Sequence, residues 1–430
     1  METRRLQNNI VAFKSPTGKV VGFHARNLEV AELTPEAWEE LSLTSQPEQS
    51  ESFQELAQWL ASENQATTSD QKVDYISSLN INVSQVCNLK CVYCEAGGDG
   101  SYGRPEKKIA LDQAVPALRR ILDRIPNGGE LTVTFVGGEP LIYPEGMKVI
   151  ADYCAEQSKG RSITLNFRVV TNGTLFTPAV ISLLKEYKMS LVVSLDGPPE
   201  LQDKIRPTAG GKGSSDKVVA GLNMLAENRS ELGSITLRSI FGKHNASVEP
   251  VYQYFKQWNF DWYEFNFDVA LSDPQISESF TESMNAVARQ AFKELGEAGI
   301  RKIKLYDRVF DRLDRQVRVE NFCDSGKSFG VIDGQGAVFK CPWETNSKKN
   351  SIGQGANIET KDLQDIEMSL IEHNNCGTCW ARHLCGGGCM YAHGLATGAK
   401  TSPDRIYCKR TRSLISEAIM FYLNSREVTQ

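Results

Sequence analysis

The sequence predicts an α/β fold in which a partial (β/α)6 parallel barrel lies between a small α+β domain and a loop-rich, cysteine-rich domain. Between residues 73 and 310, six strand patterns alternate with six helix patterns, which is the order of a parallel sheet with helices outside. Residues 1–72 contain strands followed by helices and no cysteine, whereas residues 311–410 contain seven of the eleven cysteines. Residues 411–430 read as a final helix.

The barrel elements are predicted from apolar periodicity. We expect strands near 77–85, 131–136, 164–171, 190–195, 234–240 and 260–268, and helices near 111–125, 145–158, 177–187, 214–228, 247–257 and 275–298. The carboxyl ends of parallel strands meet at one edge of a sheet, and chemistry gathers there. The site residues are therefore expected in the loops that follow these strands.

The first 72 residues predict a separate domain. Apolar segments near 10–13, 19–24 and 28–32 are typical of a small antiparallel sheet, and Ser15 to Gly18 form a turn between the first two. Thr34 is an N-cap for a helix, and a second helix is expected over 52–62. The polar residues that follow read as a linker.

The composition, with 40% hydrophobic and 23% charged residues, is typical of a soluble globular enzyme. A net charge of −5 gives no argument for nucleic acid or an anionic membrane as a partner. No apolar run is long enough for a membrane span, and no signal peptide is visible, so we expect a cytoplasmic protein. In a reducing cytosol the eleven cysteines are not a disulfide framework.

Three cysteines, Cys87, Cys91 and Cys94, lie on the loop that leaves the first barrel strand. Three thiolates on a short loop can hold three corners of a cubane iron–sulfur cluster and leave the fourth iron open. A structural zinc is the alternative, but zinc prefers four protein ligands in paired spacing. The spacing favours the open cluster.

This loop resembles the radical S-adenosylmethionine (SAM) enzymes, whose hallmark is CxxxCxxC with an aromatic residue before the last cysteine, here Tyr93. The resemblance implies a [4Fe-4S] cluster whose open iron chelates SAM. It also implies cleavage of SAM to a radical that abstracts hydrogen from a substrate. An electron donor such as flavodoxin or ferredoxin would then be a partner.

The second strand end carries Gly137, Gly138, Glu139 and Pro140. The paired glycines let backbone approach a ligand, and Glu139 could accept hydrogen bonds from an ammonium. An ordinary turn is the alternative for these four residues taken alone. The segment also resembles the motif that holds the methionine amino group in the radical SAM family.

The next strand ends carry Asn172, then Ser194 and Asp196, whose polar groups suit a ribose. Ser194 occupies the family's ribose-contacting position, and Asp196 is either a cofactor contact or a cap of the following loop. Arg206 resembles the arginine that some family members place on the cofactor carboxylate, with a solvated surface arginine as the alternative. Arg238 interrupts an apolar strand, so it needs a substrate or cofactor carboxylate or a structural ion pair.

The sixth strand predicts one polar face formed by Glu264, Asn266 and Asp268. This face would line the barrel interior. Similar peptide-modifying enzymes place a general base in this region, and we nominate Asp268 for that catalytic role.

The C-terminal cysteines are dense, with little regular structure between them, and therefore predict metal ligands. They are Cys323, Cys341, Cys376, Cys379, Cys385, Cys389 and Cys408. A zinc ribbon is the alternative, because CxxC at 376–379 is a common zinc half-site. Against it stand the odd number of thiols and the neighbouring cluster loop. His383 and His393 are expected to donate hydrogen bonds rather than to bind metal.

Their spacing resembles the SPASM auxiliary-cluster domain, so that the combined resemblance covers about residues 75–410. It implies two auxiliary [4Fe-4S] clusters, one held by Cys376, Cys379, Cys385 and Cys408. Cys323, Cys341 and Cys389 would hold the other. Cys154 or another group could complete the second cluster, although Cys154 by itself is predicted to be a small buried residue. If nothing completes it, the cluster has an open iron that suits a substrate thiolate.

The N-terminal domain resembles the winged-helix-like module with which many peptide maturases bind a leader peptide, by adding a strand to a sheet edge. A plain packing domain is the alternative. The whole pattern implies a maturase that cross-links a ribosomally made precursor peptide, with a cysteine thioether first and a carbon–carbon bond second. Sulfatase maturation is disfavoured by the missing eighth auxiliary cysteine and the extra domain. A non-catalytic iron–sulfur carrier is disfavoured by the SAM motif.

Overall fold

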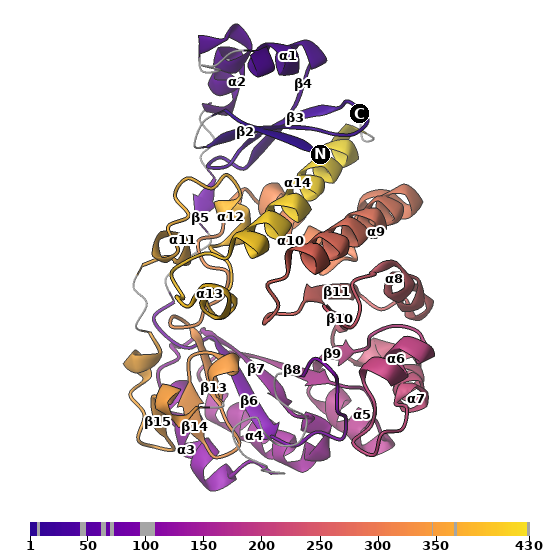
Figure 1. The fold of residues 1–430 in the computed structure, drawn as a ribbon. Coiled ribbons are helices and arrows are strands. Elements are labelled where there is room, and N and C mark those ends of the chain that lie inside the picture. The colour runs from indigo at the N-terminus through magenta and orange to yellow at the C-terminus, as the bar shows by residue number, and fades with distance from the viewer. Residues whose placement is uncertain are drawn as a thin grey trace.

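The structure is a computed structural model that describes residues 1–6, 9–43, 49–61, 66–68, 73–94, 108–345, 347–364 and 368–427. A curved parallel sheet forms its base, and the N-terminal domain lies at the opposite end (Figure 1). The long helix α14 (Arg405–Glu427) runs between them beside α9 (Pro274–Arg301). No helix in the described ranges is long and apolar enough to cross a bilayer.

The central sheet has nine strands in the order β11-β10-β9-β8-β7-β6-β13-β14-β15. The six expected strands are all present and parallel. They are β6 (Ser78–Ser84), β7 (Glu130–Gly137), β8 (Thr164–Thr171), β9 (Ser190–Ser194), β10 (Ile235–Phe241) and β11 (Trp262–Phe267). The expected partial barrel of six strands is confirmed.

Three strands of the C-terminal segment extend this sheet, which the sequence analysis did not foresee. They are β13 (Phe329–Ile332), β14 (Ala337–Phe339) and β15 (Gly353–Gln354). Strand β13 pairs in parallel with β6, so that Ile332 lies opposite Ile81, and β14 returns antiparallel. The cysteine-rich segment is therefore continuous with the barrel sheet.

Helices cover the outer face of the sheet, and their apolar faces form one large core with it. They are α3 (Leu111–Leu122), α4 (Pro144–Ser158), α5 (Pro178–Glu186), α6 (Pro199–Ile205), α7 (Ser215–Glu227), α8 (Glu249–Phe255), α9 and α10 (Lys304–Asp314). Helices α6 and α10 were not among the expected helices. The short helix α6 follows paired prolines that favour helix starts, while α10 is separated from α9 only by Lys302 and Ile303.

The N-terminal domain is a four-stranded antiparallel sheet with two helices on one face. Its elements are β1 (Glu2–Arg5), β2 (Ile10–Lys14), β3 (Val20–His24), β4 (Glu29–Leu33), α1 (Pro35–Leu43) and α2 (Glu51–Ala61). Strand β1 was not expected because its residues carry no apolar alternation. On the other sheet face, the Phe13 ring contacts the Trp380 ring at 5.0 Å, which joins the domain to the cysteine-rich segment.

The cysteine-rich segment has short elements, namely α11 (Leu370–His373), α12 (Arg382–Cys385) and α13 (Met390–Thr397). A two-residue strand, β12 (Val317–Arg318), pairs with β5 (Thr67–Thr68). The final helix begins at Arg405 instead of residue 411, so Cys408 lies in its first turn. Residues 63–65 and 69–72 of the expected linker and the last three residues of the chain lie outside the described ranges.

Candidate functional site

The loop with Cys87, Cys91 and Cys94 leaves the carboxyl end of β6, as expected. Its backbone contacts the end of α6 and the segment that follows, because Val92 N donates to the Ile205 carbonyl at 3.0 Å and Lys90 N donates to the Pro207 carbonyl at 2.8 Å. All three thiols are half-buried and unpaired by disulfides. Burial raises the pKa of Cys87 to about 11, which is the ordinary effect of removing a thiolate from water.

Asn172, at the end of β8, fixes the start of this loop. Its amide nitrogen Nδ2 donates to Asn88 Oδ1 at 2.8 Å and to Cys87 Sγ at 3.6 Å. Its Oδ1 accepts from Thr174 N at 3.0 Å, which settles the orientation of the amide. The sequence analysis assigned Asn172 to a ribose, whereas here its side chain orients the thiol loop.

Tyr93, Asp196 and Arg206 form a buried network under the same loop. The Tyr93 hydroxyl donates to Asp196 Oδ2 at 2.7 Å, and Arg206 Nη1 donates to the Tyr93 oxygen and lies 3.5 Å from Asp196 Oδ2. Arg206 is 6% exposed and Asp196 is fully buried. Burial raises the pKa of Tyr93 well above its ordinary value, so the phenol stays protonated.

This network excludes one of the two alternatives that the sequence left open for Arg206 and one of the two for Asp196. Arg206 is not a solvated surface arginine, and the Asp196 carboxylate does not cap the loop after it. The second carboxylate oxygen of Asp196 accepts from Ser239 Oγ at 2.8 Å and from Ile240 N at 3.1 Å. Asp196 therefore joins the end of β10 to the loop that carries the thiols.

Glu139 is 1% exposed and accepts three hydrogen bonds from the protein. Thr171 Oγ1 and Leu141 N donate to Oε1 at 2.7 and 3.0 Å, and Asn172 N donates to Oε2 at 2.7 Å. Burial raises the pKa of Glu139. One acceptor site on Oε2 is left for a ligand.

Gly137 and Gly138 are required by the thiol loop itself. A Cβ at Gly138 would lie 2.2 Å from the Val86 carbonyl oxygen, and one at Gly137, where φ is +131°, would lie 2.0 Å from the Ser84 oxygen. The close approach expected toward a ligand is therefore an approach to the cluster loop. Pro140 then begins one turn of 3₁₀-helix whose N-cap is Glu139.

Arg238 forms the structural ion pair that was one of its two expected roles. Its Nε lies 2.7 Å from Glu264 Oε2, and Arg308 approaches the other oxygen at 3.5 Å. Although burial opposes it, these two cations lower the pKa of Glu264. Ser194, the last residue of β9, lies beside Arg238 in the sheet register.

The seven C-terminal thiols fall into two spatial groups. Burial above all, with a smaller contribution from the neighbouring Cys389, raises the pKa of Cys323 to about 11 and of Cys341 to about 12. In the other group, burial raises the pKa of Cys385 to about 12, with contributions from Cys379, Cys408 and Cys376. These are the four-thiol and three-thiol sets that the resemblance implies.

Cys154 is not near either set. It is fully buried in α4, and burial alone raises its pKa to about 12, with no contribution from another thiol. Among the described residues, no three Cys, His, Asp or Glu side chains converge on a point that would hold a single metal ion. A cubane cluster instead gives each thiolate its own iron, and the donor sets of three, three and four thiols fit that chemistry.

His393 is buried and hydrogen-bonded within the protein. Its Nδ1 accepts from Asp404 N at 3.2 Å, and its Nε2 lies 3.3 Å from the Gly387 carbonyl oxygen. Burial lowers the pKa of His383 to about 4, so that this side chain is neutral near pH 7. His383 lies between Cys379 and Cys385 in the sequence, and His393 follows Cys389.

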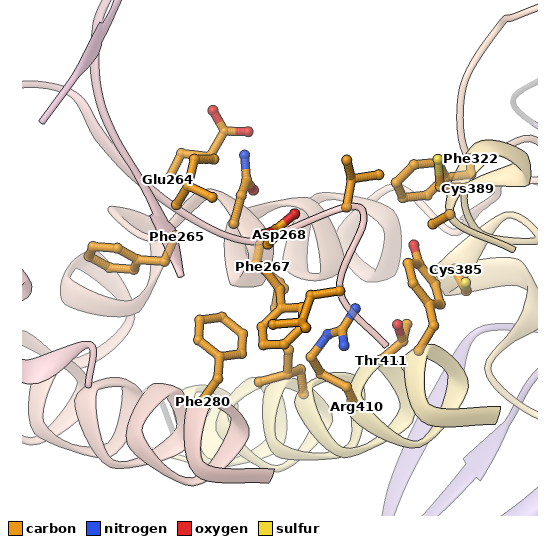
Figure 2. Close-up of a pocket in the computed structure, with 18 of the residues that line it drawn as sticks. Glu264, Phe265, Phe267, Asp268, Phe280, Phe322, Cys385, Cys389, Arg410 and Thr411 are labelled. Carbon is orange, nitrogen blue, oxygen red and sulfur yellow. The ribbon is translucent and has the colours of Figure 1, made fainter. Parts of the chain in front are cut away.

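One cavity of about 610 Å³ joins the two cysteine regions. Its lining includes Tyr93 and Cys94 from the first loop and Cys385 and Cys389 from the C-terminal segment. Asp268 lies between them on the loop after β11, and Figure 2 shows it facing the same space as Cys389. Glu264 and Asn266 also line the cavity, in agreement with the predicted polar face.

Asp268 is held by the backbone around it. Its N–H donates to the Phe241 carbonyl at 2.7 Å, and its Oδ1 accepts from Ala270 N at 3.0 Å. Two arginines of this cavity, Arg312 and Arg410, were missed by the sequence analysis. Both lie in helices with ordinary apolar periodicity, so only the three-dimensional packing shows that they line the cavity.

Comparison with known families identifies the barrel. Residues 81–255 match the family described as the Radical SAM superfamily. With the CxxxCxxC loop at the end of β6 and the parallel half-barrel, this match shows that residues 81–255 form a radical SAM domain.

Two groups of relatives resemble larger parts of the chain. The "Cysteine-type anaerobic sulfatase-maturating enzyme" of Clostridium novyi is 24% identical over 78% of this chain and 93% of its own. The "Radical SAM cyclopropyl synthase TigE" of Paramaledivibacter caminithermalis is 23% identical over 80% of this chain and 74% of its own.

Two solved structures share the fold. The structure described as "Native anSMEcpe with bound AdoMet and Cp18Cys peptide" covers 82% of this chain and 99% of its own, at a TM-score of 0.66 and 19% identity. Streptococcus suis SuiB bound to precursor peptide SuiA covers 93% of this chain and 98% of its own, at a TM-score of 0.51 and 15% identity.

Proposed function

We propose that this protein is a radical SAM maturase that installs a cysteine thioether in a precursor peptide. The observation that carries the proposal is that one cavity is lined both by Cys94 of the first thiol loop and by Cys389 of the C-terminal segment. A peptide residue in this space would lie between the SAM-binding cluster loop and the auxiliary thiols. Relatives that act on peptides or proteins support a substrate of the same class.

The radical centre would be held by Cys87, Cys91 and Cys94. When bound there, a [4Fe-4S] cluster with SAM supplies one-electron cleavage of SAM to a radical that abstracts hydrogen from a C–H bond. Glu139 and Ser194 would contact SAM, the first through its remaining acceptor site. The Asn172, Tyr93 and Arg206 network would hold the thiol loop in place during turnover.

Thioether formation removes a hydrogen atom from carbon, a proton from the thiol and one further electron. Asp268 would take the proton, since it lines the cavity on the barrel side. The group of Cys323, Cys341 and Cys389 offers three thiolates, so a bound cluster would keep one iron for the peptide sulfur. The auxiliary clusters would accept the electron.

The N-terminal domain would bind the leader peptide. Strand β1 is an edge strand of the four-stranded sheet and is mostly exposed, which suits addition of a peptide strand. The fold match to SuiB leaves only about 30 residues of this chain outside, so it must include much of residues 1–72. Cytoplasmic location and a flavodoxin or ferredoxin donor remain parts of this proposal.

Sulfatase maturation is the second candidate. It is favoured by the sequence match to a sulfatase-maturating enzyme over 93% of that protein. Carbon–carbon cross-linking of side chains would use the same cavity without a peptide thiol.

Mass spectrometry of peptides treated with the anaerobically reconstituted, reduced protein and SAM separates these candidates. A cysteine-containing peptide encoded beside the gene should lose two hydrogen atoms and keep its sulfur. A sulfatase peptide that exchanges its cysteine sulfur for oxygen would establish formylglycine formation instead. Loss of hydrogen with a free thiol still present would indicate a carbon–carbon bond, and Asp268→Asn should reduce any of these yields by about a hundredfold or more.

A further inference from the structure

Arg410 is a nearly buried cation that lines the cavity. It projects from α14, is 9% exposed, and donates from Nη1 to Ser277 Oγ at 3.0 Å. Its guanidinium carbon lies 4.1 Å from the centre of the Phe267 ring and 5.2 Å from that of Tyr407. Figure 2 shows the side chain rising from α14 toward the loop that carries Asp268.

No carboxylate of the described residues forms an ion pair with Arg410. Asp404, a carboxylate that contributes to its electrostatic surroundings, is occupied elsewhere. Its Oδ2 accepts from Ser272 Oγ at 2.9 Å and from Tyr407 N at 3.2 Å, and its Oδ1 accepts from Ile406 N at 3.0 Å. A cation buried without a counter-ion is costly, and a ligand that brings a negative charge would offset that cost.

Arg312 adds a second cation to the same cavity. It projects from α10 and donates to the Leu384 carbonyl, and burial lowers its pKa to about 10. In the described part of the chain it also lacks an ion pair. Glu264 does not balance these charges, because Arg238 and Arg308 already approach its two oxygens at 2.7 and 3.5 Å.

We propose that the cavity recognises a carboxylate of the substrate peptide and that Arg410 binds it. This inference rests on the proposed function, since it assumes that a peptide enters the cavity. The planar guanidinium, which lies near the Phe267 and Tyr407 rings, presents a fork that matches a carboxylate in two hydrogen bonds. Because Asp268 and Cys389 line the same space, the acidic group would lie close to the residue that is modified.

The carboxylate has two sources, an Asp or Glu side chain and the C-terminus of the peptide. Binding of a peptide library to the reconstituted full-length protein with SAM but no reductant tests both. The library holds acetylated hexapeptides with one cysteine each, in amidated and free-acid forms. Amidated peptides with Asp or Glu should bind about tenfold to a hundredfold more tightly than the same peptides with Asn or Gln.

The free-acid arm identifies the source. If only the free C-terminus gives the enrichment, the carboxylate is the terminal one and the inference still holds. If neither acidic side chains nor a free terminus are enriched in the wild type, the inference is wrong. This comparison needs no variant, so it remains decisive even if a substituted protein fails to fold.

Variants assign the effect to Arg410. Arg410→Gln should abolish the preference, Arg410→Lys should keep part of it, and Lys409→Gln should leave it intact. Lys409 is the matched control because it precedes Arg410 on α14 but is exposed and paired with Glu278. If Arg410→Gln keeps the preference and only shifts the reduction potential of an auxiliary cluster, the arginine serves the cluster and the proposal fails.

Adding reductant afterwards tests the proposed function separately. If acidic peptides bind but are never modified, the proposed maturase activity is wrong, whereas the proposed carboxylate site is still supported. If peptides are modified without any preference for acidic residues, the proposed carboxylate site is wrong, whereas the proposed maturase activity is supported.

Discussion

The two cysteine regions that face each other across the cavity are held in opposite ways. The loop of Cys87, Cys91 and Cys94 is fixed by side chains from the barrel strands, chiefly Asn172 and Asp196. The C-terminal thiols lie on short elements joined by turns, and Gly386, Gly387 and Gly388 all have φ between +75° and +89°. We therefore expect the barrel to preorganise the first site and the second site to depend more strongly on what its thiols bind.

The largest effect should come from the C-terminal thiols. Cys385→Ser removes a half-buried member of the four-thiol set and should destabilise that segment by on the order of 5 kcal/mol or more, as loss of a structural metal does. Cys91→Ser should abolish activity but cost about 1 kcal/mol or less. Iron content and urea unfolding of both variants provide the measurement. Equal stability losses would remove the contrast between the two regions.

The next effect should come from the ion pair under the first loop. Asp196→Ala leaves Arg206 buried without a counter-ion and should cost about 3–5 kcal/mol. Asp261→Ala is the control, since its pair with Arg229 at 2.6 Å is more exposed, and should cost about 1 kcal/mol. Urea unfolding measures both, and a loss at Asp196 no larger than the control would mean that the network does not hold the loop.

A smaller effect is expected at Gly138. An added Cβ would meet the Val86 carbonyl oxygen, so Gly138→Ala should cost about 1–3 kcal/mol and weaken SAM binding. Gly210→Ala has open space around its Cβ and serves as the control. Calorimetric titration with SAM should separate the two, and unchanged affinity in Gly138→Ala would contradict the close packing of strand end and loop.

The smallest effect concerns pH at the contact between the N-terminal domain and the C-terminal segment. Burial, then Arg26 and Arg382, lower the pKa of His24 from 6.5 to about 4, and its Nδ1 accepts from Asn27 N at 3.0 Å. Because neutral His24 is favoured in the fold, its contribution is complete above pH 6.5 and is lost as pH falls toward 4. Solvent access limits it to about 1 kcal/mol.

Urea unfolding at several pH values measures this contribution. His24→Asn should remove that part of the acid dependence, since an amide keeps the acceptor but does not titrate over this range. An acid profile of His24→Asn that superimposes on the wild type would show that His24 carries none of it.

The sequence predicted what depends on local patterns. Alternating apolar residues located all six barrel strands, and cysteine spacing located the loop of the first three thiols, whereas the ligand sets of the later thiols stay a prediction. The parallel pairing of Ile332 with Ile81 could not be predicted, because partners about 250 residues apart leave no local signal. The hydrogen-bond partners of side chains could not be predicted from the sequence either. Glu139 and Asp196 were candidate cofactor contacts, and in the structure both accept several hydrogen bonds from the protein itself.

Electron paramagnetic resonance of the auxiliary clusters tests the central claim most directly. The reconstituted, reduced Cys87→Ala/Cys91→Ala/Cys94→Ala variant lacks the radical cluster, so only the C-terminal clusters contribute to its spectrum. If the group of Cys323, Cys341 and Cys389 keeps an open iron toward the cavity, N-acetylcysteine amide should shift one of two auxiliary signals, and N-acetylserine amide should not. If neither auxiliary signal changes when the thiol is added, the proposed thioether mechanism is contradicted, because no auxiliary iron would then be available to a peptide sulfur.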